Sequence, residues 1–215
     1  GGNFVWDMFY KTKIRSYYNS LVVGTMGSGK STLLKIMEED EGVKGHFLRI
    51  FDVADEFVAL TEELGGKILK PDGSGKDIQN PLEILHATES EQLNFSRHIS
   101  RLTTFYKALN PEAESTEVTD FTNLLTEFYE SIGLTPIVDG VERQISGLPP
   151  TAYPIFSEFL DYLNKCIAEM LQKEYNEAEM VLAKTRLETL YNITGQISYI
   201  VKTYGNMFNG HSSIN

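Results

Sequence analysis

The feature that most constrains this chain is a glycine-rich run at residues 24–31. Its sequence, Gly-Thr-Met-Gly-Ser-Gly-Lys-Ser, matches the pattern G-x-x-x-x-G-K-[ST] in full and directly follows the apolar run 21–23. A helical pattern begins immediately after it. The order of strand, glycine loop and helix is the context that separates a phosphate-binding loop from a chance match. The sequence therefore predicts a P-loop.

The residue types in this run fit the chemistry of a nucleoside triphosphate and Mg²⁺. Glycines let successive backbone N–H groups approach phosphate oxygens closely. Lys30 is expected to reach the β- and γ-phosphates, and the Ser31 hydroxyl to ligate Mg²⁺. A helix that starts here would place its positive dipole end under the anion. The expected nucleotide-binding residues are Gly24, Thr25, Met26, Gly27, Ser28, Gly29, Lys30, Ser31 and Thr32.

Composition limits the class of protein. The 215 residues carry 19 basic and 30 acidic side chains, a formal charge of −11, so bulk charge does not support a diffuse basic face for nucleic acid. A local basic patch around Lys11, Lys13 and Arg15 stays open. The single cysteine, Cys166, excludes an internal disulfide framework and is expected to be a small buried hydrophobe. No run approaches the length of a membrane span.

The first part of the chain, residues 1–87, has an α/β pattern. Apolar runs predict strands at 21–23, 46–51 and 67–70, and helices are expected from Ser31 to about Glu39 and from Asp55 to about Leu64. Strands that alternate with helices indicate a parallel sheet covered by helices. We therefore expect part of a RecA-like P-loop NTPase sheet here.

Residues 88–200 have an almost wholly helical pattern. Apolar stripes predict helices around 93–106, 121–129 and 156–163, and a last helix at about 174–190, with loops at 110–117 and 135–151. We take these aromatic stripes as helix-bundle core. The pattern predicts an all-α subdomain, and residues 201–215 are expected to return toward the remainder of the nucleotide-binding domain.

Two further segments could be mistaken for nucleotide-site motifs. A second Gly-Ser-Gly-Lys occurs at 73–76, but Asp77 replaces the required hydroxyl residue, so a surface turn is expected. The strand at 47–52 ends in Asp52, as a Walker B strand would, yet no adjacent acidic pair follows it. Either the activating acid lies beyond Asn215 or the site is degenerate, and we favour the first. The opening Gly-Gly, without Met, also suggests a fragment.

Histidines give no sign of a metal centre. The four residues show no ligand spacing with one another or with Cys166; they are His46, His86, His98 and His211.

Several segments together resemble the large cytoplasmic ATPases of type IV secretion and conjugation systems, the VirB-four type. The lead-in segments 5–7 and 18–24 are similar, and GSGKST is shared with many ATPases. More specific are Phe-Asp-Val-Ala-Asp-Glu-Phe at 51–57, similar to D-P-x-x-E-[YF], then Leu-Gly-Gly at 64–66 with Asn-Pro-Leu at 80–82, and Tyr-Gly-Asn-Met-Phe-Asn-Gly at 204–210. Val53, where the family often has Pro, departs from the pattern.

The resemblance implies a RecA-like motor domain with an inserted all-α subdomain. It also implies a hexamer-forming ATPase, peripheral at the inner face of the cytoplasmic membrane, that uses ATP and Mg²⁺ and works with other type IV secretion components. In that family the Walker B strand follows the segment similar to 204–210. Glu56 is implied to lie near the active site, orienting water or coupling subunits; an exposed acid at a helix N-terminus is the alternative.

The leading hypothesis is a motor fragment for conjugative DNA or protein transfer that binds nucleotide but hydrolyses it poorly, because an acid and an arginine finger lie outside the sequence. Two alternatives stay open. One is a DNA pump of the FtsK/HerA type, with possible direct DNA contact. The other is an assembly module that binds nucleotide without hydrolysing it.

Overall fold

The computed structural model describes residues 9–10, 13, 17–70, 72–74 and 76–213. The lead-in segment 5–7 and the basic residues Lys11 and Arg15 lie outside the described residues. The chain divides into two compact units, Gly1–Ile68 and Leu69–Asn215, and each is described by itself.

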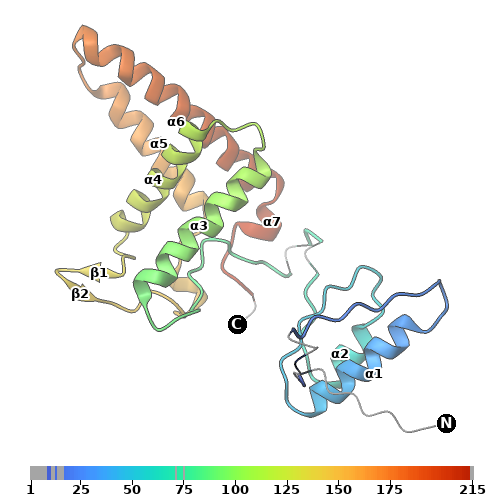
Figure 1. Cartoon of the computed structure of the whole chain (residues 1–215). Helices are drawn as coiled ribbons and strands as arrows, with labels where there is room; N and C mark the ends of the chain where they lie inside the picture. The colour runs from blue at the N-terminus through green and yellow to red at the C-terminus, as the bar shows by residue number, and fades with distance from the viewer. Residues whose placement is uncertain (1–8, 11–12, 14–16, 71, 75, 214–215) are drawn as a thin grey trace, which may run out of the picture. The chain divides into compact units, whose positions relative to one another are not determined.

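The first unit contains two helices. α1, Lys30–Val43, starts where the glycine loop ends, and α2 spans Val58–Glu63 (Figure 1). The two pack closely: a Cβ placed on Gly42 would come within 2.7 Å of Leu64 Cδ1, at the end of α2. Both helices were predicted from the sequence, and α2 begins later than expected. Gly65, with φ of 70°, ends α2 in the left-handed conformation that favours glycine.

The expected parallel sheet is not formed in the first unit. The structure assigns no strand to 21–23, 46–51 or 67–70, and Leu21 and Phe51 are 87% and 100% exposed. The physical reason is the lack of a partner: a strand satisfies its backbone N–H and C=O groups only against a neighbour. Within the described part of the chain, strands are assigned to one antiparallel pair in the second unit, β1 (Ile137–Val138) and β2 (Val141–Glu142).

The second unit is a helical bundle, as the sequence predicted. Its long helices are α3 (Glu91–Leu109), α4 (Ser115–Ser131), α5 (Phe156–Gln172) and α6 (Glu177–Thr203). A 3-10 turn, η1, covers Pro150–Ala152, and a short helix, α7, covers Gly205–Phe208. α6 extends well beyond the expected end near Leu190. Figure 1 shows α5 and α6 as an antiparallel hairpin that continues past the ends of α3 and α4.

Aromatic side chains form the centre of this bundle. Tyr106 of α3 stacks on Phe121 of α4 with ring centroids 4.2 Å apart, and Phe128 of α4 meets Phe159 of α5 at 5.1 Å. All four are at most 3% exposed. The predicted assignment of the aromatic stripes to core is therefore confirmed. Stacked and edge-to-face ring pairs add directional stabilisation to the burial of apolar area.

A polar network fixes the segment that leads into the bundle. Tyr129 Oη donates to the Leu82 carbonyl at 2.6 Å and lies 2.7 Å from His98 Nε2. Arg101 donates to the carbonyls of Pro81 and Glu83. Burial, with the nearby charge of Arg101, lowers the pKa of His98 to about 3, so this imidazole is neutral at pH 7.

Candidate functional site

The glycine loop contains two glycines in the left-handed conformation. Gly27 and Gly29 have φ of 76° and 87°, a region that L side chains rarely adopt. A Cβ on Gly24 would lie 2.4 Å from Ser28 Oγ, so the loop closes tightly on its first residue. The Ser28 N–H donates to the Thr25 carbonyl at 3.2 Å. These glycines are required by conformation and space.

The N-terminus of α1 has free backbone N–H groups that suit the binding of an anion. Its N-cap, Gly29, offers no side-chain hydrogen bond, and its first turn contains no acidic residue. By contrast, α3 and α6 are capped by Ser90 and Asn176, each with glutamate in the first turn. The first N–H groups of a helix have no intrahelical acceptor and carry partial positive charge. On α1 neither a cap nor a carboxylate competes for them.

Lys30 and Ser31 are the first two residues of this helix. The Lys30 ammonium donates to the Thr25 carbonyl at 2.8 Å, so its side chain folds back across the loop. Ser31 is half-buried beside it, whereas Met26 at the loop tip is fully exposed. The donor set consists of backbone amides, one ammonium and one hydroxyl. That set fits phosphate oxygens and a phosphate-bound Mg²⁺.

Asp52 has a structural role in the first unit. Its carboxylate accepts hydrogen bonds from the N–H of Phe57 at 2.8 Å and of Ala54 at 3.1 Å, closing the turn before α2. These bonds, the one from Phe57 first, lower the pKa of Asp52. Asp55 next to it has φ of 55°. From the sequence, Asp52 was a candidate Walker B acid, and this turn was not predicted. An Asp at the start of a short loop is nevertheless a usual signal for a turn.

Glu56 is exposed in the turn that Asp52 closes, two residues before α2 begins. The second Gly-Ser-Gly-Lys run is also placed on the surface: Lys76 is exposed and precedes Asp77, whose carboxylate accepts from the Lys70 N–H. Gly75 of that run lies outside the described residues. The described part of the chain holds no cluster of three or more His, Cys, Asp or Glu residues suited to a metal ion.

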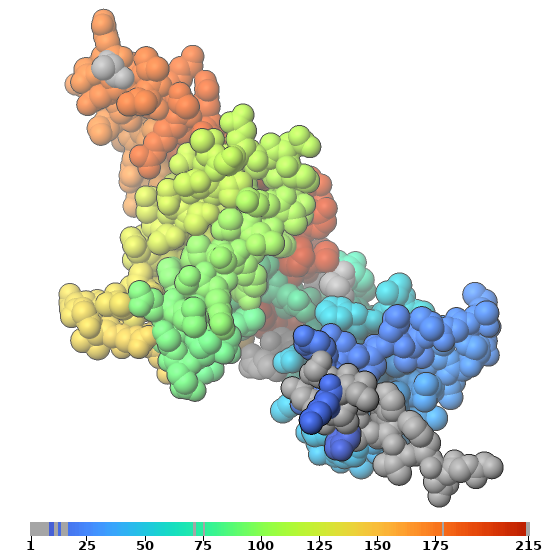
Figure 2. Space-filling model, in the orientation of Figure 1, coloured from blue at the N-terminus to red at the C-terminus, as the bar shows by residue number. Residues whose placement is uncertain are grey.

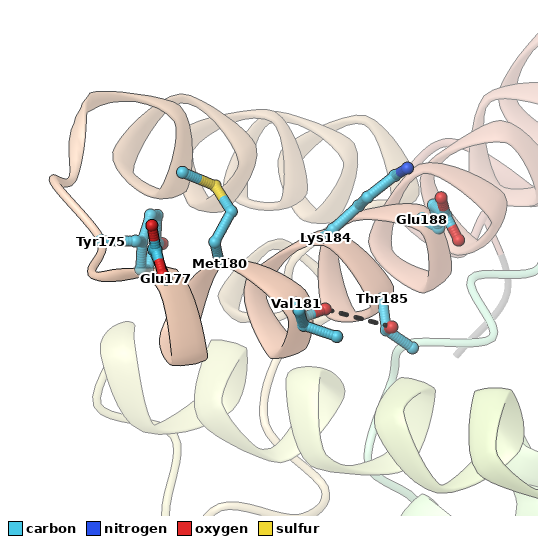
Figure 3. Close-up of a pocket in the computed structure, with 7 residues that line it drawn as sticks. All are labelled: Tyr175, Glu177, Met180, Val181, Lys184, Thr185 and Glu188. Carbon is cyan, nitrogen blue, oxygen red and sulfur yellow. Dashed lines mark hydrogen bonds between the residues drawn. The ribbon is translucent and has the colours of Figure 1, made fainter.

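Two hollows lie in the helical unit. One is a shallow depression on α6 (Figure 3), lined by Tyr175, Glu177, Met180, Val181, Lys184, Thr185 and Glu188. The other, of ≈ 590 Å³, lies among α4, α5 and α6 and includes Cys166. The sequence predicted Cys166 to be buried; it is half-buried, and desolvation raises the pKa of its thiol. Among the described residues, no helix has the length and hydropathy needed to cross a bilayer.

The loop, its left-handed glycines and the uncapped helix define a P-loop NTPase. Residues 5–207 match the model of the TraG P-loop domain, and the chain belongs to that family. It is 33% identical over 229 residues to an uncharacterized protein, pXO2-09, of Bacillus anthracis; the match covers all of this chain and 34% of that protein. The chain thus spans about a third of the length of this curated relative.

A solved structure shares the fold. VirB4 of Thermoanaerobacter pseudethanolicus superposes with a TM-score of 0.77 at 20% identity, over all of this chain and 51% of that one. The predicted resemblance to VirB-four-type ATPases is confirmed at the level of family and fold.

Proposed function

We propose that this chain is the nucleotide-binding part of an ATP-hydrolysing motor in type IV secretion or conjugative transfer. The observation that carries the proposal is the start of α1, an uncapped helix N-terminus behind a loop with left-handed Gly27 and Gly29. The TraG P-loop family supports the assignment to conjugation. In the motor, residues 1–87 belong to the nucleotide-binding domain, 88–200 form an inserted helical subdomain, and 201–215 return toward the motor domain.

The chain's own residues supply the binding half of phosphoryl transfer to water. The amides of residues 27–31 hold phosphate oxygens, and the Lys30 ammonium neutralises charge that develops on the transferred group. The Ser31 hydroxyl would hold Mg²⁺, which would supply positive charge to stabilise the phosphates when bound. Glu56, near the start of α2, orients water or couples neighbouring subunits. The acid that activates water and the arginine finger come from outside this sequence.

The exposed apolar runs of the first unit support a larger motor domain. Leu21 and Val23 before the loop, and Phe47 and Phe51 in the second run, are 78–100% exposed. Apolar runs of this kind fold as strands buried between helices in parallel sheets. We infer that they form the RecA-like sheet in the longer protein. That protein is a hexamer at the inner face of the cytoplasmic membrane, where it works with other secretion components and DNA.

Nucleotide binding tests the core of this proposal. Titration of the chain with a fluorescent ATP analogue and Mg²⁺ should give saturable binding, and Lys30→Ala should weaken it by about tenfold or more. Lys76→Ala is a matched control, because it alters the second Gly-Ser-Gly-Lys run. Equal affinity of the Lys30 variant and the wild type would remove the P-loop assignment.

The rate of ATP hydrolysis tests the proposal that the activating acid lies outside this sequence. The 215-residue chain should turn over ATP poorly, while the longer protein turns it over faster. Robust turnover by the chain itself, abolished by Lys30→Ala, would refute the claim that an activating acid lies outside it. In the longer protein, Glu56→Gln should lower turnover with little change in nucleotide affinity; unchanged turnover would leave Glu56 as an exposed acid in the turn before α2.

A further inference from the structure

We propose that the groove among α4, α5 and α6 is a docking site for an amphipathic helix with basic flanks from a partner protein. All residues of the groove belong to the second unit, and the inference does not depend on nucleotide chemistry. Each of the three helices gives it one stripe at helical spacing. The stripes are 120, 123, 124 and 127 on α4, then 162, 166, 169, 170 and 173 on α5, then 179, 182, 183, 186 and 190 on α6.

The groove has a mixed lining that includes apolar residues from all three helices. Leu124 and Leu190 are 8% and 4% exposed at its closed end, and Tyr162, Cys166 and Met170 are half-buried along α5. Toward the open end Leu182 is 74% exposed. Apolar residues of the groove therefore range from the buried core of the bundle to the exposed Leu182. This is the form in which a hydrophobic groove accepts the apolar face of a helix.

Among the residues that the structure describes, no third helix packs on the helix pair at the open end. α4 packs on both α5 and α6, but the hairpin continues past it (Figure 1), and Figure 2 shows this end of the hairpin standing clear of the rest of the helical unit. Beyond α4, Leu171, Met180 and Val181 are 55–68% exposed. Figure 3 shows Met180 and Val181 on different sides of α6, so the helix is uncovered around much of its surface here. A helix laid in line with α4 would complete the bundle.

Charge determines which helix fits. The rim has four carboxylates, Asp120, Glu127, Glu169 and Glu179, against two cations, Lys173 and Arg186. Asp120 and Glu127, about two turns apart on the same face of α4, have no hydrogen bond or ion pair with any residue that the structure describes. A partner with lysine or arginine beside its apolar stripe would pair with these carboxylates, and one with acidic flanks would be repelled.

The test uses the whole chain and two synthetic peptides. The first is a helix of about fourteen residues, roughly 21 Å long, with leucines at helical spacing and lysines on both flanks. The second has glutamates in place of the lysines. Fluorescence anisotropy should show saturable binding of the lysine peptide, weakened as salt is raised, and weaker binding of the glutamate peptide by about tenfold or more.

Cys166 reports where the peptide binds. It is the chain's only cysteine and lines the groove, so the rate of its reaction with a thiol reagent measures access to this site without engineering. Saturating lysine peptide should slow that reaction several-fold. An unchanged rate in the presence of bound peptide would place binding elsewhere and overturn the proposal.

A matched pair of double variants separates the groove from general acidity. D120K/E127K reverses two rim charges and should weaken binding of the lysine peptide by about tenfold. E130K/D161K makes the same change in total charge at exposed positions outside the groove and should leave affinity unchanged. Equal loss in both variants would overturn the proposal. So would sedimentation showing that a second copy of the chain occupies the groove, by self-association that D120K/E127K abolishes.

Discussion

The backbone N–H of Ser213 donates to the carbonyl of Ile78 at 3.0 Å, although 135 residues separate the two in the chain. Nearby, the Gln79 N–H donates to the Met207 carbonyl, and the Asn80 N–H donates to Ser212 Oγ. The segments that lead into and out of the helical unit thus lie side by side. A unit whose ends are adjacent can be carried as an insertion within another domain. This arrangement supports the proposed insertion of the helical subdomain into the motor domain.

The side chain of Asn80 should hold the segment that leads into the helical unit against the residues just before α5. Its Nδ2 donates to the Pro154 carbonyl at 2.8 Å, and its Oδ1 accepts from the Leu82 N–H at 3.0 Å, with the residue 6% exposed. Asn80→Ala leaves a buried N–H and a buried carbonyl without partners, so the free energy of unfolding should fall by about 2–4 kcal/mol. Urea unfolding followed by far-UV circular dichroism measures this loss.

Ser213→Ala is the control for Asn80. The Ser213 hydroxyl makes an exposed 3.3 Å bond to the Ile78 carbonyl, and the Ser213 backbone N–H is unaffected by the change. We expect a change within about 0.5 kcal/mol. Equal stability of the Asn80 and Ser213 variants would show that the side-chain bonds of Asn80 to Pro154 and Leu82 do not stabilise the helical unit.

His98 should make the stability of the helical unit sensitive to acid. Its pKa is about 3 in the folded chain, against a usual value of 6.5, because burial disfavours the imidazolium. Between these values the unfolded chain binds more protons, so the stability present above pH 6.5 is lost as the pH falls. The slope from this group alone is at most about 1.4 kcal/mol per pH unit.

His98→Gln isolates that contribution. Urea unfolding at pH 7 and pH 5 should show a smaller loss of stability for the variant than for the wild type, because glutamine does not titrate. His211→Gln, at an exposed position, should retain the wild-type dependence. If His98→Gln loses as much stability as the wild type between the two pH values, the acid sensitivity comes from other groups.

Tyr129→Phe should weaken the same network. The Tyr129 hydroxyl donates to the Leu82 carbonyl and bonds His98 Nε2, and both partners lie in the buried interior of the helical unit. Removing it leaves both without this partner, at a cost of about 2 kcal/mol in unfolding free energy. Tyr191→Phe, on the exposed side of α6, should be neutral in the same urea series. A neutral Tyr129→Phe would mean that Arg101 and Asn80 hold residues 81–83 without the Tyr129 hydroxyl.

The helices and the P-loop could be predicted because their signals are local. Apolar spacing indicated α3 to α6, and the G-x-x-x-x-G-K-[ST] pattern indicated the loop in which Gly27 and Gly29 are left-handed. The caps of Ser90 and Asn176 are also local, since a side chain bonds an amide three residues on.

Contacts between residues far apart in the chain could not be predicted from the sequence. Whether residues 21–23 pair as a strand depends on neighbours that the run itself does not specify. The bond between Asn80 and Pro154, and the meeting of Ile78 with Ser213, depend on how the bundle brings distant segments together. Nothing in their local sequence indicates a partner 74 or 135 residues away.

Gly24 offers a test of the loop's geometry that is separate from its charge. A Cβ at this position would lie 2.4 Å from Ser28 Oγ, nearer than real atoms approach, and 3.4 Å from the Lys30 side chain. Gly24→Ala should therefore shift the loop and weaken binding of a fluorescent ATP analogue by about tenfold, with the unfolding of the helical unit unchanged.

Removing the Ser28 hydroxyl should reverse part of this effect. In Gly24→Ala with Ser28→Ala the atom that clashes is gone, while the loop amides and Lys30 remain. The double variant should bind the analogue more tightly than Gly24→Ala alone, and Ser28→Ala alone should be close to wild type. Such a recovery would be a coupling between two contacting residues. If the double variant binds as weakly as Gly24→Ala, glycine is needed at position 24 for its backbone conformation or for close approach of a phosphate, and the contact with Ser28 does not set the affinity.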